Sequence, residues 1–230
     1  MKNYSESMKI KNVLILAAGR GNRMRPLSDI IPKAMAPYKG DTLIGNTLNN
    51  FKNGSFQIHV TVGYKSAILG QYLLTGGLVN SLINTTGQDN AWWIFNSLLS
   101  NMDKPVLVLT CDNITELDVN FIEDQYNRLN QPSCMIVPVK PINSIAGDYI
   151  THENGTIISL ERDKPSDCYC SGIQVLNPLK INKLIKSCDN FYDVWRQLID
   201  LKELKASNIY PNSWFSVDTL EQLIIHENSK

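Results

Sequence analysis

The sequence predicts an α/β fold: a three-layer, Rossmann-like domain around a mixed, mostly parallel sheet, with a small β-rich subregion. Short apolar runs alternate with helical patterns through the first half of the chain, as in strands joined by crossover helices. The run 106–110 is continuously apolar, which is typical of a parallel strand buried on both faces. A glycine turn follows the first apolar run, 13–16, where open α/β sheets bind ligands.

Length and composition are those of one large domain. The 230 residues can bury a full core, so we expect a single domain over 1–230 with a loose polar arm over 1–9. Lysine plus arginine and aspartate plus glutamate balance at 22 each, which predicts no nucleic-acid or membrane partner. Five cysteines without a C-x-x-C pair and the lack of a signal peptide or long apolar segment predict a reduced, cytoplasmic protein.

The elements expected in the first half alternate in type. Apolar residues that alternate or run continuously predict strands, and apolar residues spaced three and four positions apart predict helices. The expected strands are 13–16, 56–63, 78–85 and 106–110, and the expected helices are 41–51, 66–74 and 91–99. The second half has fewer helix signals: 133–140 and 147–176 form the β-rich subregion, with a turn at Asn154-Gly155, and a helix begins at Leu220 after a short strand.

The glycine turn has the composition of a phosphate-binding site. Gly19 and Gly21 permit a tight turn and close approach of the main chain to a ligand, and backbone N–H groups of such a turn suit phosphate oxygens. Up to four positive charges lie within fourteen residues: Arg20, Arg23, Arg25 and Lys33. A polyphosphate ligand is therefore expected, against the alternative of a surface turn with solvated arginines.

Two familiar phosphate-binding motifs are excluded. Met24 stands where a dinucleotide-binding G-x-G-x-x-G turn needs its third glycine. No Gly-Lys-Ser/Thr follows the turn, so it is not a Walker P-loop.

Two carboxylates follow apolar strands. Asp112 follows the apolar run 106–110 after one intervening residue, and Asp218 directly follows the segment 214–217, just before the last helix. An acidic residue at such a position needs a partner or a cation, and two carboxylates at one sheet edge suit Mg²⁺. The alternatives are an N-cap for Asp218 and a turn hydrogen bond to Asn113 or Ile114 for Asp112.

The segment Leu16-Ala-Ala-Gly-x-Gly-x-Arg-Met-x-Pro-Leu-Ser-x-x-x-Pro-Lys33 closely resembles the N-terminal motif of the sugar-phosphate nucleotidyltransferases, the NDP-sugar pyrophosphorylases. The resemblance implies the nucleotide-diphospho-sugar transferase (GT-A-like) fold and attack of a sugar 1-phosphate on the α-phosphorus of an NTP. It implies catalytic roles for Arg23, Lys33 and Asp112, and Mg²⁺ held by Asp112 and Asp218. The implied nucleotide-binding residues are Leu16, Ala17, Ala18, Gly19, Gly21, Asn22, Arg23, Gln88, Asn90 and Ala91, within an NTP-binding part over 10–130.

The acceptor part, 131–230, has weaker matches. Glu161-Arg-Asp-Lys-Pro165 resembles the family's Glu-Lys-Pro segment, which implies that Asp163 contacts sugar hydroxyls and Lys164 holds the sugar phosphate. Asp163 replaces the usual glutamate and reaches less far. The implied acceptor-binding residues are Gly147, Asp163, Lys164 and Gly172, and the alternative is an exposed charged loop.

Other activities stay open. Within the family, the chain most resembles short, single-domain bacterial members that make UDP-, GDP- or CDP-activated sugars, which implies a role in surface-polysaccharide synthesis. Cytidylyltransferases acting on phosphocholine-like acceptors are near relatives and stay an alternative. A glycosyltransferase would usually show Asp-x-Asp after the central strand, where this chain has Asp112-Asn113-Ile114. A non-catalytic nucleotide-sugar-binding subunit is the third alternative. The sequence does not decide the base, the acceptor or the oligomeric state, for which a homodimer is one alternative. Of Trp92 and Trp93 at most one can face a ligand.

Overall fold

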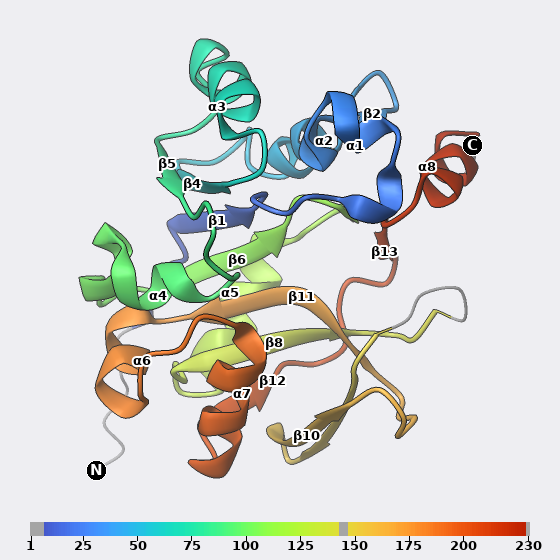
Figure 1. Cartoon of the computed structure of the whole chain (residues 1–230). Coiled ribbons are helices and arrows are strands. Elements are labelled where there is room, and N and C mark those ends of the chain that lie inside the picture. Colours follow the sequence, from blue (N-terminus) through green and yellow to red (C-terminus); the bar gives the residue numbers. More distant parts are fainter. Residues whose placement is uncertain (1–6, 143–146, 229–230) are drawn as a thin grey trace.

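The computed structural model describes residues 7–142 and 147–228, in which a nine-stranded sheet runs through the centre of the molecule (Figure 1). The strand order is β5-β4-β1-β6-β11-β8-β12-β10-β9. These strands are β1 (Asn12–Leu16), β4 (Gln57–Val62), β5 (Ser81–Asn84), β6 (Val106–Thr110), β8 (Cys134–Val139), β9 (Tyr149–Glu153), β10 (Thr156–Glu161), β11 (Tyr169–Leu176) and β12 (Leu204–Ala206). Two small two-stranded sheets pair β2 (Pro37–Tyr38) with β3 (Asp41–Thr42) and β7 (Asn113–Ile114) with β13 (Phe215–Ser216).

The first half of the sheet is parallel, which confirms the α/β fold predicted from the sequence. Strands β5, β4, β1 and β6 all run in the same direction. Strand β11 then pairs antiparallel with both β6 and β8. Strands β9 and β10 form the antiparallel far end of the same sheet, in the segment expected to be β-rich. As a result, the carboxyl ends of four parallel strands lie along one edge.

Helices cover both faces of the sheet. The helices are α1 (Leu27–Ile30), α2 (Leu43–Asn49), α3 (Ser66–Thr75), α4 (Trp92–Asn96), α5 (Val119–Arg128), α6 (Pro178–Leu184), α7 (Phe191–Asp200) and α8 (Leu220–Asn228), with 3₁₀ turns at Asn22–Met24, Lys33–Met35 and Leu98–Asn101. Of these, α1 and α8 pack in a separate apolar cluster beside the sheet. Alternate residues of a strand face opposite sides. Val13 and Ile15 therefore pack in one core with α2, α3 and α5, and Leu14 packs in another core with α4, α6 and α7. These are the three predicted layers.

Helix boundaries follow local capping. The helix expected from 41 begins at Leu43, because the Thr42 hydroxyl accepts the Gly45 N–H. The helix expected over 91–99 is interrupted at Ser97, which has an extended backbone and whose hydroxyl accepts the Leu99 N–H. Helices α5, α6 and α7 add to the elements expected from the sequence, each behind an Asp or Asn cap.

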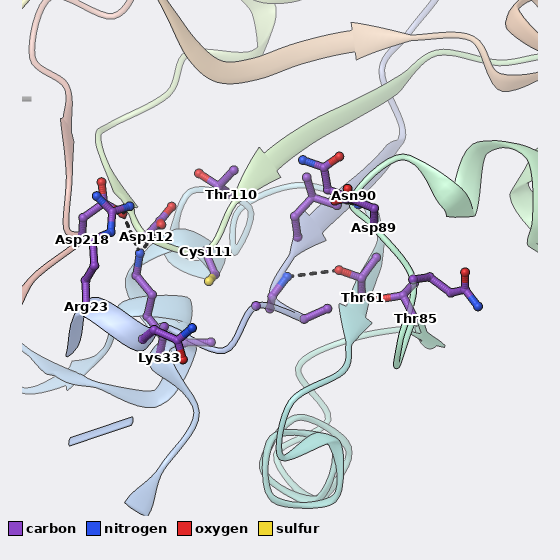
Figure 2. Close-up of a pocket in the computed structure, with 18 residues that line it drawn as sticks. Arg23, Lys33, Thr61, Thr85, Asp89, Asn90, Thr110, Cys111, Asp112 and Asp218 are labelled. Carbon is purple, nitrogen blue, oxygen red and sulfur yellow. Dashed lines mark hydrogen bonds and ion pairs between the residues drawn. The ribbon is translucent and has the colours of Figure 1, made fainter. Parts of the chain in front are cut away.

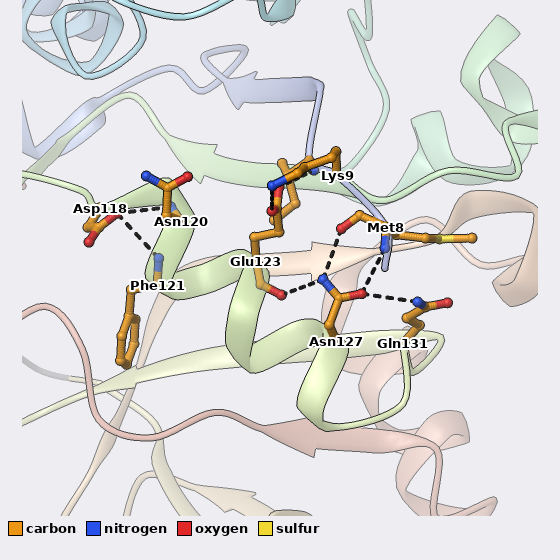
Figure 3. Close-up of polar contacts among 9 residues, drawn as sticks. Met8, Lys9, Asp118, Asn120, Phe121, Glu123, Asn127 and Gln131 are labelled. Carbon is orange, nitrogen blue, oxygen red and sulfur yellow. Dashed lines mark hydrogen bonds and ion pairs between the residues drawn. The ribbon is translucent and has the colours of Figure 1, made fainter. Parts of the chain in front are cut away.

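The start of the described chain is fastened to α5 (Figure 3). Met8 exchanges two hydrogen bonds with the Asn127 side chain, both of 2.9 Å. Lys9 pairs with Glu123 at 2.7 Å, and the same carboxylate accepts the Ile10 N–H. Met8 and Lys9, expected within a loose arm, are thus held in place, and residues 1–6 lie outside the described part. No helix in the described ranges has the length and apolar character needed to cross a lipid bilayer.

Candidate functional site

A cavity of about 520 Å³ opens at the carboxyl ends of β1, β4, β5 and β6 (Figure 2). It is lined by Leu16, Ala17, Ala18, Gly19, Gly21, Asn22, Arg23, Lys33, Ala34, Thr61, Thr85, Gln88, Asp89, Asn90, Thr110, Cys111, Asp112 and Asp218. Residues far apart in the sequence thus meet in one hollow. It contains the predicted glycine turn and both predicted carboxylates.

The glycine turn is shaped by a left-handed residue and by the neighbouring strand. Gly21 has φ 62° and ψ 40°, and a Cβ there would lie 2.8 Å from the Lys33 Cβ. No other residue fits that space without moving the Lys33 stem. The Ala17 N–H donates to the Thr61 hydroxyl at 3.1 Å, which ties the start of the turn to β4. The turn is therefore preformed around the lysine.

Four charged side chains form an ion cluster at one end of the cavity (Figure 2). The Lys33 ammonium lies 2.5 Å from Asp112 Oδ2 and 3.0 Å from Asp218 Oδ1. The Arg23 guanidinium lies 2.9 Å from the same Asp218 oxygen. The side chain of Lys33 is 13% exposed, whereas that of Arg23 is 68% exposed, so Lys33 is the inner cation and Arg23 the outer one.

The small sheet of β7 and β13 brings the two carboxylates together. Asn113 and Ile114 pair antiparallel with Ser216 and Phe215, respectively. The Val217 N–H then donates to the Asp112 carbonyl at 3.0 Å. This ladder joins positions more than 100 residues apart in the chain and sets Asp218 beside Asp112.

Asp218 does not cap the last helix. The Thr219 hydroxyl accepts the Gln222 N–H, while the Gln222 side-chain oxygen accepts the N–H groups of Asp218 and Thr219. This is a reciprocal capping box. The Asp218 carboxylate is thereby left to the cations of the cluster, and the capping alternative is excluded for it. The Asp112 carboxylate likewise pairs with Lys33.

The protonation of the cluster follows from its charges. Burial disfavours the Lys33 ammonium, but the negative charges of Asp112 and Asp218 outweigh this effect and hold the pKa of Lys33 above its ordinary value. Lys33 is therefore a cation at neutral pH. Burial raises the pKa of the neighbouring Cys111 thiol to about 12, so this sulfur is a neutral group and not a nucleophile.

The carboxylate pair has the donor chemistry of a magnesium site. Asp112 and Asp218 present hard oxygen donors that converge on one cation, here the Lys33 ammonium. Within residues 7–142 and 147–228, no group of three or more His, Cys, Asp and Glu side chains is placed to hold a metal. Two carboxylates suit Mg²⁺ when phosphate oxygens and waters complete its shell.

The opposite end of the cavity carries uncharged amides and one carboxylate. Gln88, Asp89 and Asn90 lie in the segment that joins β5 to α4. Asn90 Oδ1 accepts the Phe191 N–H at 3.0 Å, which fixes that side chain and leaves its NH₂ group for a ligand. Trp93 is fully buried in the core, and Trp92 packs beside the same core.

The remaining predicted residues lie away from the lining. Ala91 is fully buried, and its N–H donates to the Asp189 carbonyl. Lys164 is exposed and pairs with Glu161 at 2.7 Å. Asp163, in the same loop, is exposed as well. Gly147 faces the ring of Tyr169, and Gly172 packs against Thr110, which lines the cavity.

Several lining residues were not expected from the sequence. They are Thr61, Thr85, Thr110 and Cys111 at the ends of β4, β5 and β6, together with Ala34 and Asp89. For the three threonines and Cys111, the position at or next to the end of a predicted parallel strand is the signal that could have indicated them, because such ends share one edge.

The chain is similar to known nucleotidyl transferases in sequence. The family model described as nucleotidyl transferase matches residues 12–225. Glucose-1-phosphate adenylyltransferase of Aliivibrio fischeri (strain MJ11) is 27% identical over 179 residues, covering 68% of this chain and 44% of the relative. The enzyme of the same name from Thermotoga sp. (strain RQ2) is 27% identical over 206 residues, covering 77% and 48%. The chain thus spans about half the length of the curated relatives it matches.

Solved structures share the fold. The inositol-1-phosphate CTP transferase from T. maritima superposes with a TM-score of 0.78 at 15% identity, covering 95% of this chain and 94% of that one. A UDP-glucose pyrophosphorylase complexed with UDP-glucose gives a TM-score of 0.75 at 17% identity, covering 96% and 98%. With a family match over almost the whole described chain, and with the motif and fold that the sequence predicted, the chain belongs to the nucleotidyl transferase family.

Proposed function

We propose that this protein transfers a nucleotidyl group from an NTP to a sugar 1-phosphate, forming an NDP-sugar and pyrophosphate with the help of Mg²⁺. The arrangement of the cavity carries this proposal. One end holds the preformed glycine turn and the ion cluster, and the other end holds the amides of Gln88 and Asn90. A triphosphate chain with a base at its end matches such a layout in charge and polarity.

The residues of the chain act by position and charge. Backbone N–H groups of Gly19–Arg23 hold the triphosphate, as expected for a glycine turn at a strand end. The exposed guanidinium of Arg23 neutralises charge that builds on the departing pyrophosphate, and Lys33 neutralises charge near the α-phosphoryl group. In phosphoryl-type transfer such positioning supplies most of the rate.

Asp112 and Asp218 are the residues that would hold Mg²⁺. When bound, the ion supplies Lewis-acid polarisation and a template for the phosphates. No general base is needed on the protein, because the phosphate of the acceptor is already a nucleophilic anion near neutral pH. Conversion of either carboxylate to an amide would remove a hard anionic ligand without changing the size of the side chain.

The acceptor is the less defined substrate. The implied acceptor residues Asp163 and Lys164 lie on an exposed loop outside the cavity lining, so contact with an acceptor needs that loop to move or the acceptor to extend toward it. A second candidate acceptor class is phosphocholine-like or polyol phosphates. The fold shared with an inositol-1-phosphate CTP transferase is compatible with that class. A role in surface-polysaccharide synthesis belongs to the sugar-phosphate candidate.

Pyrophosphate release tests both candidates. The four common NTPs and dTTP are crossed with a panel of sugar 1-phosphates, inositol 1-phosphate and phosphocholine, with Mg²⁺ present. Release that requires one NTP and one acceptor would support transfer and identify both substrates. Because a glycosyltransferase releases no pyrophosphate, that activity is distinguished in the same assay. If no pair gives release and no NTP stabilises the protein against heat, the enzymatic proposal is wrong.

A further inference from the structure

The ion cluster is electrically balanced by its own side chains. Asp112 and Asp218 contribute two negative charges, and Lys33 and Arg23 contribute two positive charges, all within 3.0 Å of a partner. The two carboxylates are mostly buried, with 18% and 20% of their side-chain surfaces exposed. Buried charges of this kind are tolerated when they are paired. A divalent ion that entered alone would therefore meet a pair of carboxylates whose charge is already neutralised.

The Lys33 ammonium also occupies the space that a bridging ion would need. It contacts one oxygen of Asp112 and one of Asp218 at the same time. A magnesium ion binds oxygen at roughly 2.0–2.1 Å, so it cannot bind Asp112 Oδ2 and Asp218 Oδ1 while the ammonium lies between these two oxygens. Entry of the ion at this position requires the ammonium to leave, and a charge that leaves a mostly buried position needs a new anionic partner.

A triphosphate would provide that partner. Lys33 lines the same cavity as the glycine turn, and its Cβ lies beside Gly21 of that turn. The end of its flexible four-carbon chain can therefore exchange carboxylate oxygens for phosphate oxygens while the stem stays in place. Arg23, which is exposed and pairs with Asp218, can make the same exchange. Both carboxylates are then left without a cation.

We propose that Lys33 is a placeholder for the divalent ion. In the free protein its ammonium holds Asp112 and Asp218 together, and it leaves these carboxylates only when it pairs with a nucleotide phosphate. This inference rests on the proposed function, because it assumes that these carboxylates bind Mg²⁺. It predicts an order of binding that the chemistry alone does not require: the metal enters with the nucleotide or after it. The free protein has low metal affinity, and the nucleotide raises it.

Metal binding to the nucleotide-free protein tests the placeholder directly. The full chain is titrated with Mn²⁺ and followed by electron paramagnetic resonance and water-proton relaxation, which report bound metal without turnover. Lys33→Met keeps the length of the side chain and removes its charge. We expect it to bind Mn²⁺ at least about 10-fold more tightly than the wild type, within the usual range of coupling between sites.

Two controls accompany this titration. Lys39→Met makes the same exchange at an exposed lysine outside the cavity lining and is expected to bind Mn²⁺ like the wild type. The double variant Lys33→Met with Asp112→Asn is expected to lose the added affinity, because one of the two carboxylates is gone. Equal Mn²⁺ affinity in the wild type and in Lys33→Met, with both proteins folded by thermal melting, would overturn the proposal.

A second arm uses the wild type alone and so does not depend on the folding of any variant. The α,β-methylene analogues of ATP, GTP, CTP and UTP are added in turn with Mn²⁺. One of them is expected to produce the relaxation enhancement of protein-bound metal at concentrations where protein without nucleotide gives none. Strong Mn²⁺ binding by the nucleotide-free wild type, with pyrophosphate release intact, would overturn the placeholder and leave the proposed function standing. Absence of bound Mn²⁺ in every form would overturn both the placeholder and the magnesium site.

Discussion

Replacement of Gly21 by alanine tests whether the glycine turn and Lys33 form one packed unit. The left-handed backbone of Gly21, φ 62°, costs an alanine about 1–2 kcal/mol. The new Cβ would lie 2.8 Å from the Lys33 Cβ, and such overpacking costs about 1–3 kcal/mol more. Because alanine lowers the conformational entropy of the unfolded chain, it offsets about 0.4–1 kcal/mol of these two costs. We therefore expect Gly21→Ala to lower the free energy of unfolding by about 3 kcal/mol.

Three other glycines separate the two costs. Gly77 has φ 61° with open space around it, so Gly77→Ala measures backbone strain alone and should cost about 1 kcal/mol. Gly63 has no left-handed backbone, but a Cβ there would lie 2.8 Å from the Ala18 carbonyl oxygen, so Gly63→Ala measures overlap alone. Gly19 has neither feature, and Gly19→Ala should change the free energy of unfolding by less than about 0.5 kcal/mol.

Urea unfolding followed by fluorescence measures all four variants. With a slope of about 3 kcal/mol per molar urea for a chain of this size, the midpoint of Gly21→Ala should fall by about 1 M. The midpoint of Gly77→Ala should fall by about a third of that. If Gly21→Ala unfolds at the same urea concentration as Gly77→Ala, Lys33 does not pack on the turn and the reasoning is refuted.

Three further outcomes are expected. Asp112→Asn should reduce turnover by about 10²-fold or more, as for loss of other charge-stabilising groups; pyrophosphate release measures this, and wild-type turnover would contradict the metal assignment. Lys164→Ala should raise the KM for the acceptor and leave the KM for the NTP unchanged if that lysine holds the acceptor phosphate. Lys186→Ala, at another exposed lysine, is the control, and equal acceptor KM values in the two variants would remove Lys164 from the site. Burial raises the pKa of the Cys111 thiol to about 12, so the unfolded chain ionises first as pH rises, and stability contributed by the neutral thiol is lost above about pH 9. Mass-mapped iodoacetamide labelling at pH 8 should therefore modify Cys111 only after unfolding, and rapid labelling of this cysteine in the native protein would contradict its burial.

The local sequence was enough to predict much of the fold. The apolar runs gave strands β1, β4 and β6 within one or two residues, because a strand buried on both faces needs an apolar residue at nearly every position. Helix ends were less predictable. Ser97 interrupts an otherwise helical pattern through its own hydroxyl contacts, and such competition between side chain and backbone is invisible to periodicity.

The candidate site also has a part that the sequence predicted and a part that it left undecided. The motif from Leu16 to Lys33 contains the glycine turn and the cations in one stretch, and its resemblance to a known family could be read directly from the sequence. The resemblance also pointed to Asp112 and Asp218 as a pair. Their individual positions after apolar strands did not decide between a metal ligand and a helix cap. A capping box by Thr219 and Gln222 excludes the helix cap for Asp218, whereas its role as a metal ligand stays a proposal.

By itself, then, the sequence determined the family motif, the alternation of elements and the strand end at which the ligand site would form, because these depend on residues close together in the chain. Only the tertiary structure decided what the charged groups do to one another. The pairing of β7 with β13 sets Asp218 beside Asp112, and the packing of Lys33 on Gly21 directs its ammonium between them. Those contacts join segments separated by tens to more than a hundred residues, and their energies depend on distance and burial, which no local pattern specifies.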